Sequence, residues 1–251
     1  MKYSLITLFC CFAILSPTQN KEEFSLQHKD FAVRVGITKP EKSIKNKGTI
    51  VLLHGWNLPP QQWCSKSTIC YIASSEGFSI IIPDFGKTTY HYETYPETRK
   101  DYLKYPTRQW MYDSLIPYIQ KNYKLLLAGE NNFVAGLSTG GRGAALFALE
   151  KPEIFKAAAC LSADFDQTKI AGEAINTGYY GAYEKHKLRW ESKDNLHNRA
   201  CEFSVPLYLA HGTNDKVCPH SQTKLFYQKL KSCNKTLAHK IFLDENYGHD
   251  Y

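Results

Sequence analysis

A short apolar run, a Gly-rich turn and a helix-forming segment follow one another over residues 132–150. Residues 132–137 (Asn-Phe-Val-Ala-Gly-Leu) have the composition of a buried strand. Residues 136–141 (Gly-Leu-Ser-Thr-Gly-Gly) then turn the chain, and residues 142–150 are rich in helix formers. So tight a turn needs glycines where helix and strand approach, and it places Ser138 in a strained backbone conformation. The order strand, sharp turn, helix indicates a nucleophile elbow.

The Gly-x-Ser-x-Gly pattern alone is weak evidence for catalysis. With Gly and Ser usage near ~7% each, it arises by chance in roughly one chain in ten of this length. A serine hydroxyl is also a poor nucleophile unless a base, an orienting acid and an oxyanion site surround it. The rest of the chain must supply those groups, or the segment is only a turn.

The chain divides into a leader and one domain. Met1 and Lys2 precede an apolar stretch over residues 5–15, which is too short to span a bilayer and is typical of a signal peptide over residues 1–20. An uncleaved anchor or an amino-terminal strand is the alternative. Residues 21–251, in a chain that is 43% hydrophobic and 22% charged, suit one globular domain. We therefore expect a secreted or periplasmic protein without a stable membrane anchor after cleavage.

The cysteines and charges narrow the class further. Beyond the leader there are six cysteines, namely Cys64, Cys70, Cys160, Cys201, Cys218 and Cys233. Export permits disulfides, but the sequence leaves 15 full pairings open. Cysteine and histidine spacings indicate no metal or cofactor. The net charge of +7 is spread along the chain without a basic run, so nucleic-acid binding is not expected. The oligomeric state stays open.

Apolar runs alternate with helical stretches along the domain. The expected strands are residues 49–53, 79–83, 132–137, 156–161, 206–210 and 239–243, with an antiparallel edge strand at 31–38. The expected helices are residues 107–122, interrupted or kinked at Pro117, then 142–150 and 221–230. This alternation predicts an α/β fold with a mostly parallel sheet flanked by helices.

Polar residues follow four of these strands, where sites of parallel sheets collect. His54-Gly-Trp-Asn57 follows the first strand and Ser138 follows the third. Asp215 lies after the strand at 206–210, and His249 lies after the last strand. The order Ser, Asp, His at strand ends is that of α/β-hydrolase triads.

On these residues the chain resembles the α/β-hydrolase superfamily over about residues 48–250. Within it, residues 136–145 and 152–162 are similar to the elbow, helix and next strand of the esterase D and feruloyl-esterase-like group. One departure is Leu137, where many members of that group carry His. The resemblance implies an α/β-hydrolase fold in which residues 163–200 form a small cap or insertion.

The resemblance also implies a role for each candidate residue. Ser138 would be the nucleophile, His249 the base and Asp215 the acid that orients the imidazole. The oxyanion hole would use the backbone N–H groups of Thr139 and Trp56.

Each role has rivals elsewhere in the chain. His211, His220 and His239 are alternative bases, although His211 and His239 are better explained as structural. Asp164 and Asp244 are alternative acids.

Aromatic residues in two long loops are candidates for the substrate pocket. The loops are residues 84–106 and 163–200, and the candidate side chains are Tyr90, Tyr92, Tyr180 and Trp190. Alternatively, these rings only pack the loops onto the sheet. The leading functional hypothesis is an exported serine hydrolase that cleaves small carboxylic esters through an acyl-enzyme. A serine peptidase or amidase on the same fold and a catalytically silent binding protein are the alternatives.

Overall fold

The computed structural model describes residues 20–28, 31–102, 105–233 and 235–249. The predicted signal peptide therefore lies outside the described residues, except for its last residue. Within the described part of the chain, no helix has the length and apolar character needed to cross a bilayer.

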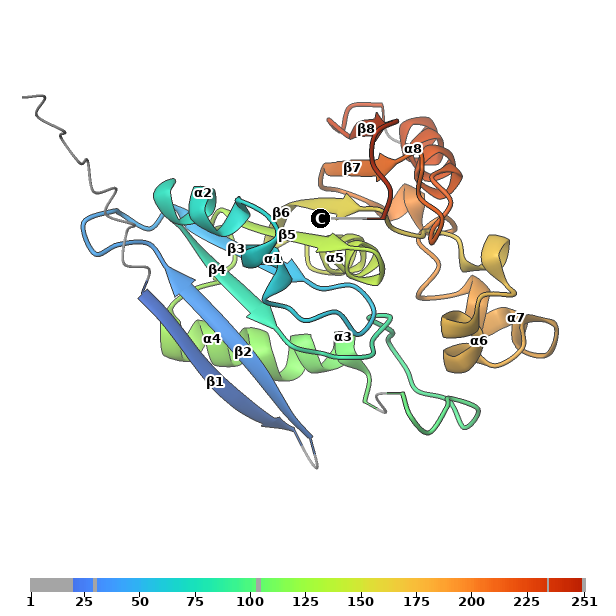
Figure 1. Cartoon of the computed structure of the whole chain (residues 1–251), viewed down its shortest axis with the longest axis horizontal. Helices are drawn as coiled ribbons and strands as arrows, with labels where there is room; N and C mark the ends of the chain where they lie inside the picture. Colours follow the sequence, from blue (N-terminus) through green and yellow to red (C-terminus); the bar gives the residue numbers. More distant parts are fainter. Residues whose placement is uncertain (1–19, 29–30, 103–104, 234, 250–251) are drawn as a thin grey trace, which may run out of the picture.

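One eight-stranded sheet organises the molecule, with spatial order β1-β2-β4-β3-β5-β6-β7-β8 (Figure 1). The strands are β1 (Asn20–His28), β2 (Phe31–Lys39), β3 (Gly48–Leu53), β4 (Phe78–Pro83), β5 (Asn132–Leu137), β6 (Phe155–Leu161), β7 (Leu207–Gly212) and β8 (Lys240–Asp244). β2 pairs antiparallel with both β1 and β4, and every later pair is parallel. The predicted mostly parallel sheet is confirmed, and the strand predicted at 31–38 is antiparallel as expected. It is not an edge strand, however, because β1, which the sequence pattern did not predict, pairs along its outer side.

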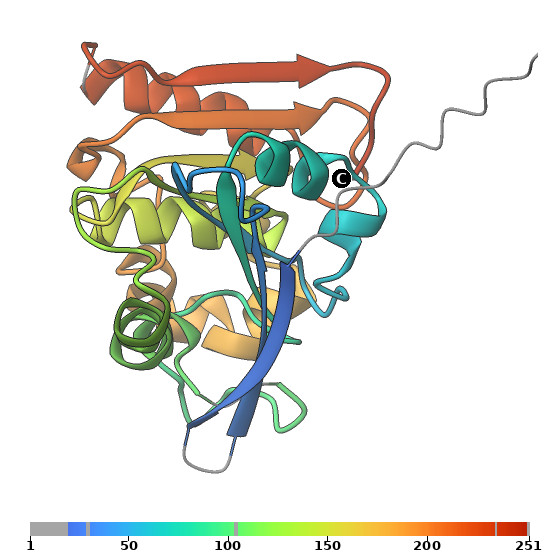
Figure 2. The same ribbon diagram turned by 90° about the vertical axis from the view of Figure 1, so that its left-hand side faces the viewer.

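Helices cover both faces of this sheet. They are α1 (Gln62–Ser65), α2 (Ile69–Ser75), α3 (Thr107–Trp110), the π-helix η1 (Met111–Leu115), α4 (Ile116–Tyr123), α5 (Thr139–Glu150), α6 (Ala174–Tyr180), α7 (Tyr183–Glu191) and α8 (Ser221–Cys233). Short 3-10 turns form η2 (Gln167–Ile170) and η3 (Ala200–Glu202). Figure 2 shows α1 and α2 together on one side of the strands.

Two apolar clusters fill the space between helices and sheet. The larger one joins α3, α4, α5 and α8 to one face, with Trp110, Phe147 and Phe226 fully buried. The smaller one joins α1 and α2 to the opposite face through Trp63 and Leu52. Both faces of the central strands are therefore apolar, which explains why these strands appear in the sequence as continuous apolar runs rather than alternating ones.

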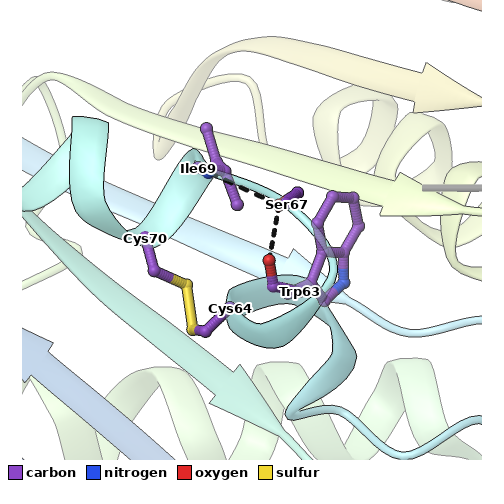
Figure 3. The surroundings of a disulfide bond; sticks show 5 residues. All are labelled: Trp63, Cys64, Ser67, Ile69 and Cys70. Atoms are coloured by element: carbon purple, nitrogen blue, oxygen red, sulfur yellow. Dashed lines mark hydrogen bonds between the residues drawn. A yellow bond between two sulfur atoms is a disulfide. The ribbon is translucent and has the colours of Figure 1, made fainter.

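Two disulfides are present among the described residues. Cys64–Cys70 joins α1 to α2, and in Figure 3 the Ser67 hydroxyl between them donates to the Trp63 carbonyl. Cys201–Cys233 ties η3 to the end of α8. Cys160 and Cys218 are free and buried.

The helix predicted over residues 107–122 is divided in an unexpected way. Instead of a kink at Pro117, a π-helical segment at 111–115 separates α3 from α4. Pro117 occupies the first turn of α4, where its missing N–H breaks no helical bond. The wider π turn before the proline thus accommodates it while the chain stays helical.

The segment 163–200 contains η2, α6 and α7, and a buried ion pair fastens it to α3. The Asp194 carboxylate accepts from the Arg108 guanidinium at 2.7 Å and from the Tyr180 hydroxyl at 2.8 Å. Arg108 is fully buried and also lies 3.0 Å from a carboxylate oxygen of Glu150. This segment is therefore held to the rest of the domain by charge as well as by aromatic packing.

Candidate active site

Ser138 lies at the sharp turn between β5 and α5. Its φ of 57° and ψ of −124° belong to a backbone region that a non-glycine residue occupies at a cost of about 1–3 kcal/mol. The Ser138 N–H donates to the Leu161 carbonyl at 2.8 Å, and its own carbonyl accepts from Gly141 at 2.9 Å. The surrounding backbone therefore holds the strained conformation that the sequence predicted.

The elbow glycines are required by close backbone contacts. A Cβ at Gly136 would lie 2.0 Å from the Gly140 carbonyl oxygen, and one at Gly140 would lie 2.3 Å from the Leu53 carbonyl oxygen. These distances are far below van der Waals contact, and backbone atoms cannot move aside as a flexible side chain would. Only glycine allows α5 to start this close to β3 and β5.

The loop after β3 packs directly against the elbow. A Cβ at Gly55 would lie 3.2 Å from the Ser138 Cβ. The buried His54 ring holds this loop, because its Nε2 accepts the Phe85 N–H at 2.9 Å and its Nδ1 lies 2.7 Å from the Gly55 carbonyl oxygen. Burial lowers the pKa of His54, so the ring is neutral and supports the loop. Trp56, the next residue, is partly exposed.

Thr139 is the first residue of α5. Its N–H therefore belongs to the helix-terminal donors that have no acceptor within the helix. Thr139 directly follows Ser138, and Trp56 follows β3, so both belong to the edge of the sheet where β3 and β5 end. Their roles as oxyanion donors stay predictions.

Asp215 and His249 meet beyond the ends of β7 and β8. The His249 Nδ1 lies 2.7 Å from the Asp215 Oδ2, and the Asp215 side chain is fully buried. The other oxygen, Oδ1, accepts the Val217 and Cys218 N–H groups at 2.8 Å each. Burial opposes ionisation of Asp215, but these donors outweigh it and lower the pKa of the carboxyl. The acid is therefore ionised and fixed against the imidazole.

The chain after β8 brings His249 to this position. The Asn214 N–H donates to the Tyr247 carbonyl at 3.1 Å, and a Cβ at Gly212 would lie 2.2 Å from the same carbonyl oxygen. In Figure 1 this last segment turns back past the end of β7. Ser138, Asp215 and His249 thus lie at one edge of the sheet, the carboxyl ends of β5, β7 and β8.

The rival acids have other partners. The Asp164 carboxylate accepts from Arg142 at 2.6 Å. The Asp244 carboxylate accepts from the N–H of Asn246 at 2.9 Å. Of the three candidate acids, Asp215 is the one that contacts His249.

The rival bases lie in different settings. The His239 ring accepts the Leu207 N–H at 3.2 Å, at the amino end of β7 and so at the far end from Asp215. His220 is partly exposed and directly precedes α8. His211 is buried, and its Nε2 lies 3.0 Å from the Asp215 Oδ2, which sequence reasoning did not predict.

The four predicted substrate-binding side chains are placed mostly inside the protein. Tyr90, Tyr180 and Trp190 are at most 1% exposed, so these three present no surface to a ligand in this conformation. The Tyr90 hydroxyl donates to the His54 carbonyl, and the Trp190 indole donates to the Gly181 carbonyl. Tyr92 is partly exposed, between the cations of Arg108 and Lys193. Substrate contact stays a prediction.

A different set of rings stands beside the loop after β3. The Trp56 ring meets Tyr102 edge-on at 4.7 Å between centroids and Tyr179 at 6.0 Å. Tyr102 and Tyr179 lie in the two long loops but were not among the four predicted side chains. No signal in the sequence indicated that they would converge on Trp56, because they come from separate loops. No group of three potential metal ligands occurs within the described residues.

Comparison with known proteins places this geometry in context. The model of the prolyl oligopeptidase family, Peptidase_S9, matches residues 65–250. No curated protein matched the chain.

Solved structures share the fold at low sequence identity. FphF, a fluorophosphonate-binding serine hydrolase of Staphylococcus aureus, has a TM-score of 0.73 and 17% identity, over 93% of this chain and 92% of its own. A ferulic acid esterase has a TM-score of 0.65 and 18% identity, over 92% and 91%. The acylaminoacyl peptidase of Pyrococcus horikoshii has a TM-score of 0.68 and 17% identity, over 92% of this chain but 38% of its own. The predicted α/β-hydrolase fold is thereby confirmed.

Proposed function

Because the chain belongs to the prolyl oligopeptidase family of serine hydrolases, we propose that it is an exported enzyme that cleaves carboxylic esters through an acyl-enzyme. The observation that carries the proposal is the Asp215–His249 contact of 2.7 Å at the sheet edge where Ser138 occupies a strained turn. A strained serine, a buried ionised carboxylate and an imidazole at one edge are the parts that acyl transfer requires.

The proposed chemistry assigns one role to each group. The Asp215 carboxylate accepts the Nδ1–H of His249, which leaves the Nε2 lone pair free to take the Ser138 proton. The Ser138 Oγ attacks the ester carbonyl carbon, and the Thr139 and Trp56 N–H groups bind the resulting oxyanion. Collapse of this intermediate expels the alcohol, which takes the proton from His249. Water then repeats the sequence and releases the acid.

Likenesses to solved structures bear on whether the substrate is an ester or a peptide. The chain spans 33–38% of the length of the peptidases that it resembles but 91–92% of FphF and of the ferulic acid esterase. The likeness to the ferulic acid esterase supports esters. Amide cleavage is the second candidate, because the family and the peptidase likenesses favour it.

Export is proposed from two observations. The amino-terminal residues 1–20 have the pattern of a signal peptide. The two disulfides fit an oxidising compartment such as the periplasm or the cell exterior.

Labelling with a fluorophosphonate probe tests the nucleophile. We expect the wild type to be labelled and Ser138→Ala to be silent. Ser162→Ala is the matched control, because Ser162 also follows a strand of the same sheet edge and also has a positive φ, of 48°. We expect its labelling to equal that of the wild type. An unlabelled wild type would favour the silent binding protein.

Substrate class is tested by turnover of paired substrates with the same acyl group. We expect short p-nitrophenyl esters to be cleaved at higher kcat/KM than aminoacyl p-nitroanilides. Faster anilide cleavage would replace the esterase by the peptidase. A panel that varies acyl length and alcohol would then define the ester.

A further inference from the structure

A second chain of buried polar contacts, which starts at α8, also reaches Asp215. The Thr223 hydroxyl of α8 lies 2.7 Å from the His211 Nδ1, and the His211 Nε2 lies 3.0 Å from the Asp215 Oδ2. Thr223 and the side chain of His211 are completely buried. The same Oδ2 is the one that contacts His249, so one carboxylate oxygen is shared by two imidazoles.

The neighbours of His211 settle where its proton lies. Its Nε2 faces two acceptors at 3.0 Å each, the Asp215 Oδ2 and the Cys218 carbonyl oxygen. Two acceptors require a donor, so Nε2 carries the hydrogen. In the neutral ring Nδ1 then has a lone pair, and it accepts the hydroxyl hydrogen of Thr223.

Burial keeps the His211 ring neutral. Burial lowers the pKa of His211, although the Cys218 carbonyl and Asp215 act in the opposite direction, and His249 adds to the lowering. From the surrounding elements, Asp164 and Arg142 act on the neighbouring Cys218, and burial raises the pKa of that thiol. The ring therefore donates a hydrogen bond to Asp215 without bringing a second positive charge next to His249.

We propose that His211 is a positioning residue. Its Nε2–H bond fixes the shared Asp215 oxygen against His249 and moderates the basicity of that oxygen, while Thr223 holds the His211 tautomer. This inference rests on the proposed function, since it assumes that Asp215 and His249 act in catalysis. The His211 Nε2–H draws electron density from Oδ2. Oδ2 therefore accepts the hydrogen bond of His249 more weakly than it would if His211 donated nothing to it.

Removing the His211 donor is expected to shift the pH profile of kcat/KM in one direction. In His211→Met, Oδ2 loses one partner and accepts more strongly from His249, so the imidazolium is favoured. The acid limb of the kcat/KM profile then moves to higher pH by roughly half a unit to one unit. The freed carboxylate is also less well oriented, and we expect a loss of about tenfold in kcat/KM at the optimum.

His211→Gln is the matched variant. The glutamine side chain is close to methionine in size, but its Nε2 donates to Asp215 and its Oε1 accepts from Thr223, so it keeps both bonds. We expect its kcat/KM within about threefold of the wild type and its acid limb unmoved. Thr223→Val should move the limb in the same direction as His211→Met but less, whereas Thr223→Ser should leave it in place.

The experiment measures pH profiles of p-nitrophenyl ester hydrolysis, with active sites titrated by the fluorophosphonate so that unfolded protein does not count. A merely structural role would lower the unfolding temperature of both His211 variants and leave both profiles unchanged per active site. That result, or a limb of His211→Met that moves to lower pH, would overturn the inference. If instead the wild type is not labelled at Ser138, the proposed function itself fails.

Discussion

Replacing Asp194 by Asn isolates the charge that fastens the 163–200 segment to the domain. The substitution preserves side-chain shape but removes the negative charge that lies 2.7 Å from the fully buried Arg108 guanidinium. Breaking a buried pair from one side typically costs about 3–5 kcal/mol. Glu150 remains 3.0 Å from Arg108, so we place the loss in the free energy of unfolding at the lower end, about 3 kcal/mol.

A matched control lies one residue away. Lys193 pairs with Glu93 at 2.8 Å and joins the 163–200 segment to the loop after β4, but these side chains are 56% and 48% exposed. Exposed pairs contribute about 0–1 kcal/mol, so Glu93→Gln should change little. Urea unfolding with the disulfides intact measures both variants. For a chain of this size about 3 kcal/mol corresponds to a fall of roughly 6–12 °C in Tm.

The pH dependence supplies a second measurement. Burial opposes ionisation of Asp194, but Arg108 and the other partners outweigh it and lower the pKa of the carboxyl. A lowered pKa gives stability that is present above the unfolded value of about 4 and is lost as pH falls through the folded value. The difference between wild type and Asp194→Asn should therefore shrink below about pH 4. An equal loss in the free energy of unfolding for Asp194→Asn and Glu93→Gln at pH 7 would refute this prediction.

Two further predictions concern packing and cross-links. Gly143→Ala would place a Cβ 2.5 Å from the buried Tyr90 ring, so we expect a net loss of about 1–2 kcal/mol after the helical preference for alanine is counted. Gly172→Ala, with open space around its Cβ, should lie within about 0.5 kcal/mol of the wild type in the same urea titration. Replacing both cysteines of Cys201–Cys233, 32 residues apart, by serine should cost about 4 kcal/mol, against about 2 for Cys64–Cys70, 6 residues apart. Equal losses in calorimetry would contradict the loop-length argument.

The parallel strands were predictable because they are buried on both faces. Residues 49–53 and 132–137 lie within β3 and β5, and the continuous apolar run is all the signal that such a strand needs. β1 was not predicted, because residues 21–27 are mostly polar and exposed. Phe24 packs on Tyr118 and Tyr123, a long-range contact that no local pattern reports.

The predicted helix boundaries were wrong where tertiary contacts outweigh local helix preference. α5 starts at Thr139, three residues before the predicted start at Arg142, because Gly140 and Gly141 are weak helix formers that crowding nonetheless requires there. α6, with seven residues, is too short to show a helical period.

The candidate triad was predictable from strand ends, since topology alone brings those ends to one edge. The contact of the second imidazole, that of His211, with Asp215 was not predictable. It depends on where β7 ends between these two residues. The buried state of Tyr90 and Tyr180 was equally hidden, since a loop tyrosine has the same sequence pattern whether it faces solvent or the core.

Tyr90 connects its own loop to the loop after β3 and to α5, so substitutions at these places depend on one another. It has a φ of 55°, its hydroxyl donates to the His54 carbonyl beside the elbow, and its ring occupies the space that the missing Cβ of Gly143 leaves open. We expect positions 90 and 143 to covary among relatives, with a small residue at 90 wherever 143 bears a side chain. Relatives that lose the tyrosine would then need a different support for the loop that carries Trp56.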